Sequence, residues 1–205
     1  MKKTTFMLCA LLVFAISCKK EEKKEEVAQL PPINDVFKGF YEDGLKLNPI
    51  NATFAGDTRY NNILPNSISE EFLNETKEYY SKYKNKILEY NKDSLSEKDK
   101  MSYDVLIWDC DINLEGLKYP THLTPINQFY SLPQTMGQLA GGTSAQPFNT
   151  VKDYKDWLSR LDAYIVWCDT AIANMKKGIE KGYVLPKALT EKVIPQIESF
   201  SIGPV

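Results

Sequence analysis

The chain has 205 residues, of which 43% are hydrophobic, 12% are aromatic and 25% are charged, and its formal net charge is −2 at pH 7. This length suffices for one domain with a substantial hydrophobic core, or for part of a larger domain. Acidic and basic residues are mixed along the chain without a basic surplus, which argues against nucleic acid as a partner.

The first 17 residues predict a secretory signal peptide. Two lysines follow Met1, and residues 4–16 form an almost uninterrupted apolar run. The run is shorter than the roughly 20 apolar residues that a transmembrane helix needs. We therefore expect an export signal and not a permanent membrane span.

The residues at the end of this run predict a lipid anchor. Ala15-Ile16-Ser17-Cys18 resembles the lipobox of bacterial lipoproteins, although Ala15 stands where leucine is usual. The resemblance implies cleavage after Ser17 and attachment of membrane lipid to the sulfur of Cys18. The alternative is an ordinary signal peptide followed by a chance cysteine. We expect a cell-envelope protein held in the outer membrane by its acylated cysteine.

A charged segment follows Cys18. Residues 19–26 consist only of lysine and glutamate and cannot bury apolar surface. We predict that residues 18–30 form a lipidated tether for a helical domain at residues 31–205. The segment also resembles the surface-export signal of Bacteroidetes lipoproteins, which implies exposure at the cell surface. A plain spacer is the alternative.

The next part of the chain predicts three helices. The first follows Pro31-Pro32 and ends before Asn48. Ser67 and Glu70 predict a capping box for a long, tyrosine-rich amphipathic helix. Either Ser96 or Ser94 caps the third helix, whose two apolar faces predict a central position. These faces carry Met101, Val105, Trp108 and Ile112 on one side, and Tyr103, Leu106, Cys110 and Leu117 on the other.

Residues 119–149 interrupt the helical pattern with prolines and glycines. Loops of this length are usually functional, and this one contains apolar residues that need burial. We predict short helices and turns that line a groove. The alternative is a segment that only crosses the core.

Two helices are predicted beyond this loop. Thr150 and Asp153 cap an amphipathic helix of about 30 residues, which Gly182 closes in a left-handed conformation. A last helix begins near Pro186, and Pro195 should bend or end it. We expect the apolar faces of both helices to lack partners, with the chain ending inside a larger fold.

Residues with obvious catalytic chemistry are scarce. The sequence has no HExxH or GxSxG motif, and His122 is its only histidine, whereas protein zinc sites generally need several His or Cys ligands. We therefore assign no catalytic or metal-binding residue. Cys110 and Cys168 either form a disulfide or remain buried thiols, because their spacing decides neither.

Several ordered motifs resemble the bacterial domain of unknown function 885 (DUF885) family. They occupy residues 48–53, 56–60, 95–106, 125–128, 147–154 and 178–197. Family members are mainly helical and resemble zinc-dependent peptidases, with an HExxH-type helix in their C-terminal half. The resemblance implies an all-α, irregular multi-helix array that is the N-terminal part of a larger gluzincin-like fold.

The same resemblance implies two hypotheses about function. In the first, the chain is the N-terminal fragment of a membrane-anchored metallopeptidase-like lipoprotein, inactive alone, which walls a peptide cleft and packs against a missing catalytic part. Zinc is implied only for full-length members. Asn127 and Gln128 are the candidate cleft residues, and their alternative role is to hold the loop by hydrogen bonds. In the second hypothesis, the chain is a stand-alone helical binding module.

Overall fold

The computed structural model describes residues 30–199. The predicted signal peptide, Cys18 and nearly all of the tether therefore lie outside the described residues. Within this range the chain forms seven α-helices and three short 3-10 helices, with no strand, which confirms the predicted all-α class. No helix in the same range is long and apolar enough to span a membrane.

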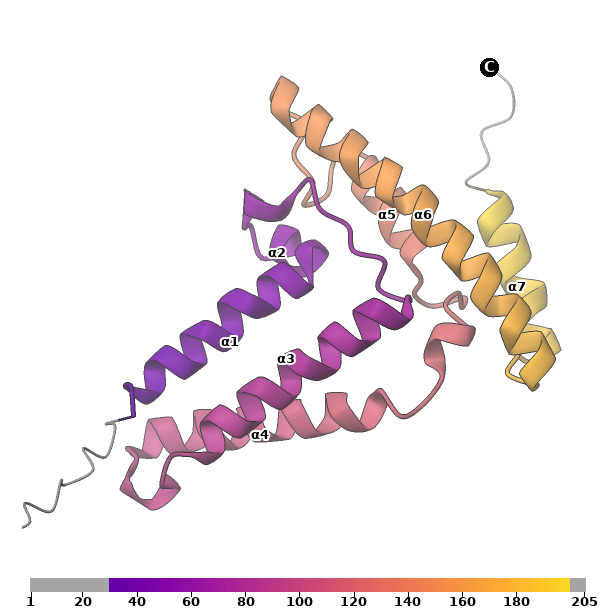
Figure 1. Ribbon diagram of the computed structural model, residues 1–205. Helices are drawn as coiled ribbons and strands as arrows, with labels where there is room; N and C mark the ends of the chain where they lie inside the picture. The colour runs from indigo at the N-terminus through magenta and orange to yellow at the C-terminus, as the bar shows by residue number, and fades with distance from the viewer. Residues whose placement is uncertain (1–29, 200–205) are drawn as a thin grey trace, which may run out of the picture.

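The helices follow one another with mostly short connections (Figure 1). In chain order they are α1 (Ile33–Leu47), α2 (Pro49–Phe54), η1 (Thr58–Tyr60), α3 (Glu70–Leu88), η2 (Lys92–Ser94), α4 (Glu97–Gly116), η3 (Thr121–Leu123), α5 (Leu132–Ala140), α6 (Val151–Lys181) and α7 (Lys187–Glu198).

Helices α1, α3 and α4 form one group around a shared core (Figure 1). The buried residues of this core come from all three helices and include Val36, Ile87 and Leu106. Phe40 of α1 stacks on Tyr79 of α3, with ring centroids 5.2 Å apart. Burial of these apolar and aromatic side chains is what holds the three helices together.

The N-terminal cap of α3 differs from the predicted one. Ser69, and not Ser67, is the cap, and its hydroxyl accepts a hydrogen bond from the Phe72 amide at 3.2 Å. The prediction was wrong because Ser67 is taken up by a tertiary contact, in which its hydroxyl accepts a hydrogen bond from the indole of Trp167. At α4, the choice between two serines is settled in favour of Ser96.

Helix α4 is not central among the described helices, so the central position predicted for it was wrong. Leu106 and Cys110 are buried against α1 and α3, as one of the two predicted faces requires. The other face is exposed, and its residues are Met101, Val105, Trp108 and Ile112. Two apolar faces indicate that a helix can be packed on both sides, but only one face of α4 is packed by the described residues.

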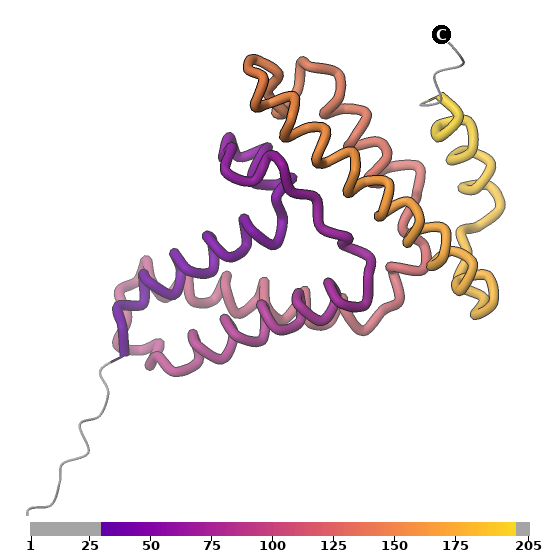
Figure 2. The backbone as a smooth tube through the Cα atoms, turned by 45° about the horizontal axis from the view of Figure 1, so that its top comes forward, coloured from indigo at the N-terminus to yellow at the C-terminus, as the bar shows by residue number. Residues whose placement is uncertain are grey.

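Helices α5, α6 and α7 form a second group, and Figures 1 and 2 both show α5 beside α6 and α7 beside the C-terminal part of α6. Met136 and Leu139 of α5 pack with Leu64 and with Trp157 of α6 in a second buried cluster. The irregular segment 119–149 thus contributes both to a core, through α5, and to a surface groove described below.

Helix α6 has the predicted length and caps. Its 31 residues begin with a complete Thr150–Asp153 capping box, and Gly182 ends it with φ 75°. Its buried face, however, is not its most apolar one. The buried residues include Arg160 and Asn174, whereas a stripe of apolar residues at alternating spacings of three and four is turned outwards. Its exposed members are Val151, Tyr154, Leu158, Ile165, Ile172 and Ile179. We call this stripe the α6 seam.

The polar buried face of α6 meets the irregular segment between η1 and α3. Asn174 donates to the carbonyl of Ile68 at 2.9 Å, and Asn66 donates to the hydroxyl of Thr170 at 2.7 Å. Backbone groups in irregular segments have no ladder partners, so the helix beside them must supply polar side chains. This requirement explains why the apolar seam lies on another face.

Helix α7 carries no buried residue. Pro195 lies inside α7, and the helix continues to Glu198. Of the two predicted effects of Pro195, bending or ending the helix, the second is therefore wrong. Leu189, Val193 and Ile197 are half-buried and Ile194 is exposed. The apolar face of α6 is therefore largely open, as expected, whereas that of α7 is only partly open, because three of these four residues are half-buried.

Candidate functional site

The largest fully buried side chain of the described residues is Arg160, which is 0% exposed. Its guanidinium donates to the carbonyl oxygens of Pro49, Tyr60 and Ile63 at 3.1–3.2 Å. It also donates to the hydroxyl of Thr53 at 2.7 Å and to the side-chain oxygen of Gln146 at 2.6 Å, so that five oxygen atoms surround it.

This network joins segments that are far apart in the sequence. Loss of water lowers the pKa of Arg160 to about 10, and the nearby charge of Asp156 opposes that shift. The oxygen atoms replace the lost hydration, so the cation is retained without a direct carboxylate partner. Because the guanidinium is enclosed, it holds α2, η1 and α6 together and is not available to a ligand.

The predicted cleft residues lie in the loop that precedes α5. The side-chain oxygen of Asn127 accepts hydrogen bonds from the amides of Phe129 and Tyr130, at 2.9 and 3.0 Å. This is the loop-holding role that was the alternative for Asn127. Its side chain shapes the loop, and the phenyl and phenol rings that follow are strongly exposed.

Gln128 takes part in a cluster of three glutamines. Its backbone carbonyl accepts hydrogen bonds from the side-chain amides of Gln134 in α5 and Gln196 in α7, both at 3.3 Å. The side-chain amide of Gln134 also donates to the side-chain oxygen of Gln196 at 3.4 Å. The cluster therefore ties the 124–131 loop to both neighbouring helices, a contact for which the sequence offers no spacing signal.

Three polar atoms in this region are buried without a hydrogen-bond partner. They are the side-chain oxygens of Gln128 and Gln134 and the hydroxyl of Ser131. Such atoms are uncommon in folded proteins, because each carries a desolvation cost of about 1–3 kcal/mol. Two of the three are pure acceptors, and the third can accept as well. The region is thus short of hydrogen-bond donors.

An apolar groove borders the glutamine cluster. Its volume is about 480 Å³, and its walls come from η3 and the following loop, the C-terminal part of α6, and α7. Gln196 lies between the groove residues Val193 and Ile197 on α7, and Gln128 follows the groove residue Ile126 by two positions. A groove of this size accommodates aliphatic side chains or a small apolar ligand.

A close approach of backbones shapes the groove. An added Cβ at Gly178 of α6 would lie 2.7 Å from the carbonyl oxygen of Tyr183 and 2.8 Å from that of Leu123. Only glycine therefore allows η3 and the α6–α7 connection to lie this close to the helix. In the sequence, Gly178 stood out only as the first residue of the motif at residues 178–197, and nothing there indicated the close backbone contact that requires glycine.

The remaining candidate groups do not assemble into a reactive site. His122 is half-buried, and burial lowers its pKa. Cys110 and Cys168 are free thiols, which settles the question of a disulfide, and burial raises the pKa of Cys110 to about 11. Residues 30–199 contain no group of three His, Cys, Asp or Glu side chains that could hold a metal ion, so the residues described do not fit the zinc implied for the family.

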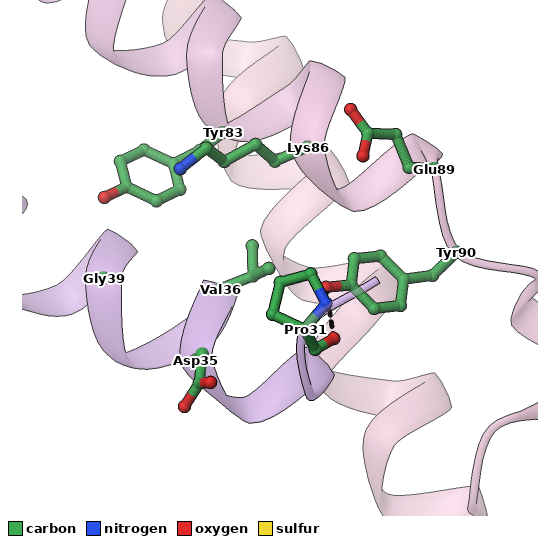
Figure 3. A pocket seen from close by; sticks show the side chains of 8 residues that line it. All are labelled: Pro31, Asp35, Val36, Gly39, Tyr83, Lys86, Glu89 and Tyr90. Carbon is green, nitrogen blue, oxygen red and sulfur yellow. Dashed lines mark hydrogen bonds between the residues drawn. The ribbon is translucent and has the colours of Figure 1, made fainter. Parts of the chain in front are cut away.

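A smaller cavity of about 290 Å³ lies where the chain enters α1 (Figure 3). The phenol of Tyr90 donates to the carbonyl of Pro31 at 2.7 Å and attaches the start of the helical part to the end of α3. Asp35 and Glu89 lie around the cavity, and Lys86 extends towards the ring of Tyr83. This arrangement anchors the segment that follows the predicted tether.

A family model described as a bacterial protein of unknown function (DUF885) matches residues 49–204. The chain belongs to this family. The DUF885 match covers α2 to α7, and with them Arg160, its oxygen partners, the glutamine cluster and the apolar groove. The comparison with curated proteins finds no match, and neither does the comparison with solved structures.

Proposed function

We propose that this chain is the envelope-anchored N-terminal helical portion of a DUF885 protein and forms one wall of a peptide-binding cleft. The observation that carries the proposal is the apolar groove of about 480 Å³ beside the glutamine cluster that holds the 124–131 loop. A peptide offers apolar side chains to such a groove. Asn127 holds the loop in place.

Catalysis by this chain alone is not part of the proposal. The resemblance implies that full-length members use zinc, which polarises a carbonyl and activates water when bound. The described residues supply no ligand set for it. The contribution that we propose for them is to bind and orient the peptide. The purified chain should therefore bind peptides without cleaving them.

Peptide binding can be measured with fluorescently labelled peptides rich in Leu and Ile. Ile194→Gln should weaken binding at least about fivefold, because it removes apolar surface from the α7 wall of the groove. Ile112→Gln is the matched control, since Ile112 is similarly exposed on α4 and lies outside the groove. Equal binding by both variants would contradict the cleft assignment.

The anchor is a separate part of the proposal, supported by the apolar run and the lipobox-like residues that end in Cys18. Intact mass spectrometry of the membrane-associated protein tests it. We expect a mature chain that begins at Cys18 and carries lipid, and we expect Cys18→Ser to remain unprocessed. An unmodified Cys18 in the wild-type protein would refute the anchor.

A stand-alone binding module is the second candidate function. It is favoured by the fact that the groove is formed entirely by residues 123–198. The neighbouring DNA distinguishes the two. An adjacent reading frame that encodes an HExxH segment supports the N-terminal portion and contradicts the independent module.

A further inference from the structure

The α6 seam has the periodicity of a coiled-coil interface. Its residues recur at alternating spacings of three and four from Val151 to Ile179, a length of about 40 Å along the helix. The six exposed members are 50–73% exposed, and the alternate positions Leu161, Cys168 and Met175 are half-buried. A seam of this length on a single helix is sufficient to pack a second helix along it.

Four charged residues flank the seam in a fixed pattern. Lys155, Asp162, Asp169 and Lys176 each follow a seam residue by four positions, so they lie along one edge of it. All four are exposed, and none forms an ion pair with another described residue. The edge therefore presents the charges basic, acidic, acidic and basic.

From this edge we infer that the α6 seam docks an amphipathic helix whose flanking charges run acidic, basic, basic and acidic. Opposite charges at such edge positions set partner choice in paired helices, and like charges exclude partners. Because the pattern reads the same in both directions, it selects the partner by its charges and permits either orientation.

A second copy of this chain does not fit the full length of the seam. In a fully overlapping antiparallel pair of α6 helices, Lys155 would face Lys176 of the other copy. Asp162 would face Asp169 in the same pair, so that every edge contact would be repulsive. In a parallel pair, these charges would face positions such as Trp157 and Tyr164, which are packed against the chain's own core.

The inference rests on the proposed function, because a chain that forms one wall of a cleft must pack against the part that completes it. The α6 seam is the surface suited to that packing, and its edge charges define the complementary charges that the partner helix must carry. The seam lies outside the glutamine cluster, although its C-terminal members Met175 and Ile179 also line the apolar groove.

Two synthetic amphipathic helices test the inference. Both have the length of the seam and the same apolar stripe and composition. One carries flanking Glu, Lys, Lys and Glu, and the control carries Lys, Glu, Glu and Lys. Fluorescence anisotropy with the full mature protein should show that the first peptide binds at least about tenfold more tightly than the control at low salt, with a smaller difference at high salt.

A charge-reversed protein variant completes the test. The quadruple variant Lys155→Glu, Asp162→Lys, Asp169→Lys and Lys176→Glu should prefer the control peptide. Since these side chains are exposed and unpaired, circular dichroism should be unchanged. Equal affinity for both peptides, no binding, or a stable dimer that protects the seam would overturn the inference. None of these outcomes affects the lipid on Cys18 or the effect of Ile194→Gln on peptide binding, by which the proposed function is judged.

Discussion

Arg160 brings a positive charge into a site that water does not reach, and it meets the oxygens of neutral groups there. Its partners at Pro49, Thr53 and Tyr60 belong to the motifs by which the sequence resembles the DUF885 family. The motifs near residues 48–60 therefore have a structural explanation, because they supply the oxygens that solvate a buried cation.

Substitution of Arg160 should destabilise the fold strongly. Arg160→Met fills a similar volume but leaves several buried oxygens without a donor, so we expect a loss of about 3 kcal/mol or more in the free energy of unfolding. Urea denaturation followed by circular dichroism measures it. Arg59→Met is the control, since Arg59 is exposed and pairs with Asp57 and Glu42 at the surface. Similar midpoints for the two variants would contradict the buried network.

Asp43 is the residue for which the structure predicts a pH effect. Hydrogen bonds from Lys82 at 2.7 Å and from Tyr83 at 2.6 Å lower the pKa of Asp43 to about 2. A lowered pKa means that the carboxylate stabilises the fold fully above its ordinary value of 3.8 and loses this contribution as the pH falls towards 2.

The test compares thermal midpoints of the wild type and Asp43→Asn across this pH range. The wild type should lose more stability than the variant between pH 4 and 2, whereas the difference between the two proteins should be constant from pH 5 to 7. Parallel curves throughout would show that Asp43 has no special partner in the folded state.

At the scale of helices, the caps and the glycines decide where elements end and how closely they approach. Gly182 and Gly116 form a matched pair, because an added Cβ meets no atom within 4 Å at either position. Only Gly182 has a left-handed backbone, with φ 75°. The two positions therefore separate backbone strain from steric crowding.

Alanine should lower the free energy of unfolding at Gly182 but not at Gly116. Gly182→Ala should lower the free energy of unfolding by about 1 kcal/mol, because alanine is strained in the left-handed region. Gly116→Ala should be neutral or stabilise by about 0.5 kcal/mol, because alanine favours helix and restricts the unfolded chain. Chemical denaturation measures both, and an equal loss in the two variants would argue against the cap.

Gly178→Ala tests the close approach of η3 to α6. The methyl group would overlap two backbone oxygens, so η3 must shift, and we expect a loss of about 1–3 kcal/mol. Hydrogen exchange should accelerate at the amides of Leu123 and Thr124, which bond within η3. Unchanged exchange there would mean that the approach is not required.

At the scale of the whole molecule, the main feature is apolar surface that the chain does not cover. The α6 seam and the outer face of α4 are open, although the cores beside them are well formed. Exposed apolar surface of this extent is typical of interaction surfaces. It is consistent with the proposal that further polypeptide packs on this part of the DUF885 fold.

The folded protein should therefore bind a hydrophobic dye such as ANS. Ile165→Gln, in the exposed seam, should reduce dye fluorescence and leave the unfolding midpoint nearly unchanged. Leu139→Gln, at a fully buried position, should destabilise the fold by about 2–5 kcal/mol and increase dye binding. Absence of dye binding by the wild type would show that the seam is covered in solution.

The sequence determined most of the local structure. Helical spacing, prolines and caps predicted where α1, α6 and α7 begin, and the capping residues of α6 were identified correctly, whereas the start of α4 was left open between Ser94 and Ser96. The prediction for α3 failed by two residues, because Ser67 and Ser69 are equally suitable caps and a contact with Trp167 decides between them. Capping depends on neighbours in the sequence, except where a tertiary partner competes.

The tertiary structure alone decided which faces meet. The partners of Arg160 lie as many as 111 positions away in the sequence, and the glutamine cluster joins residues 68 positions apart. Periodicity identifies an apolar face but not its partner, and it cannot show that a helix must turn polar side chains towards an irregular backbone segment. The sequence by itself therefore determined the five longer helices and the family, but not α2, whereas packing between distant segments decided the buried cation, the groove and the open seam.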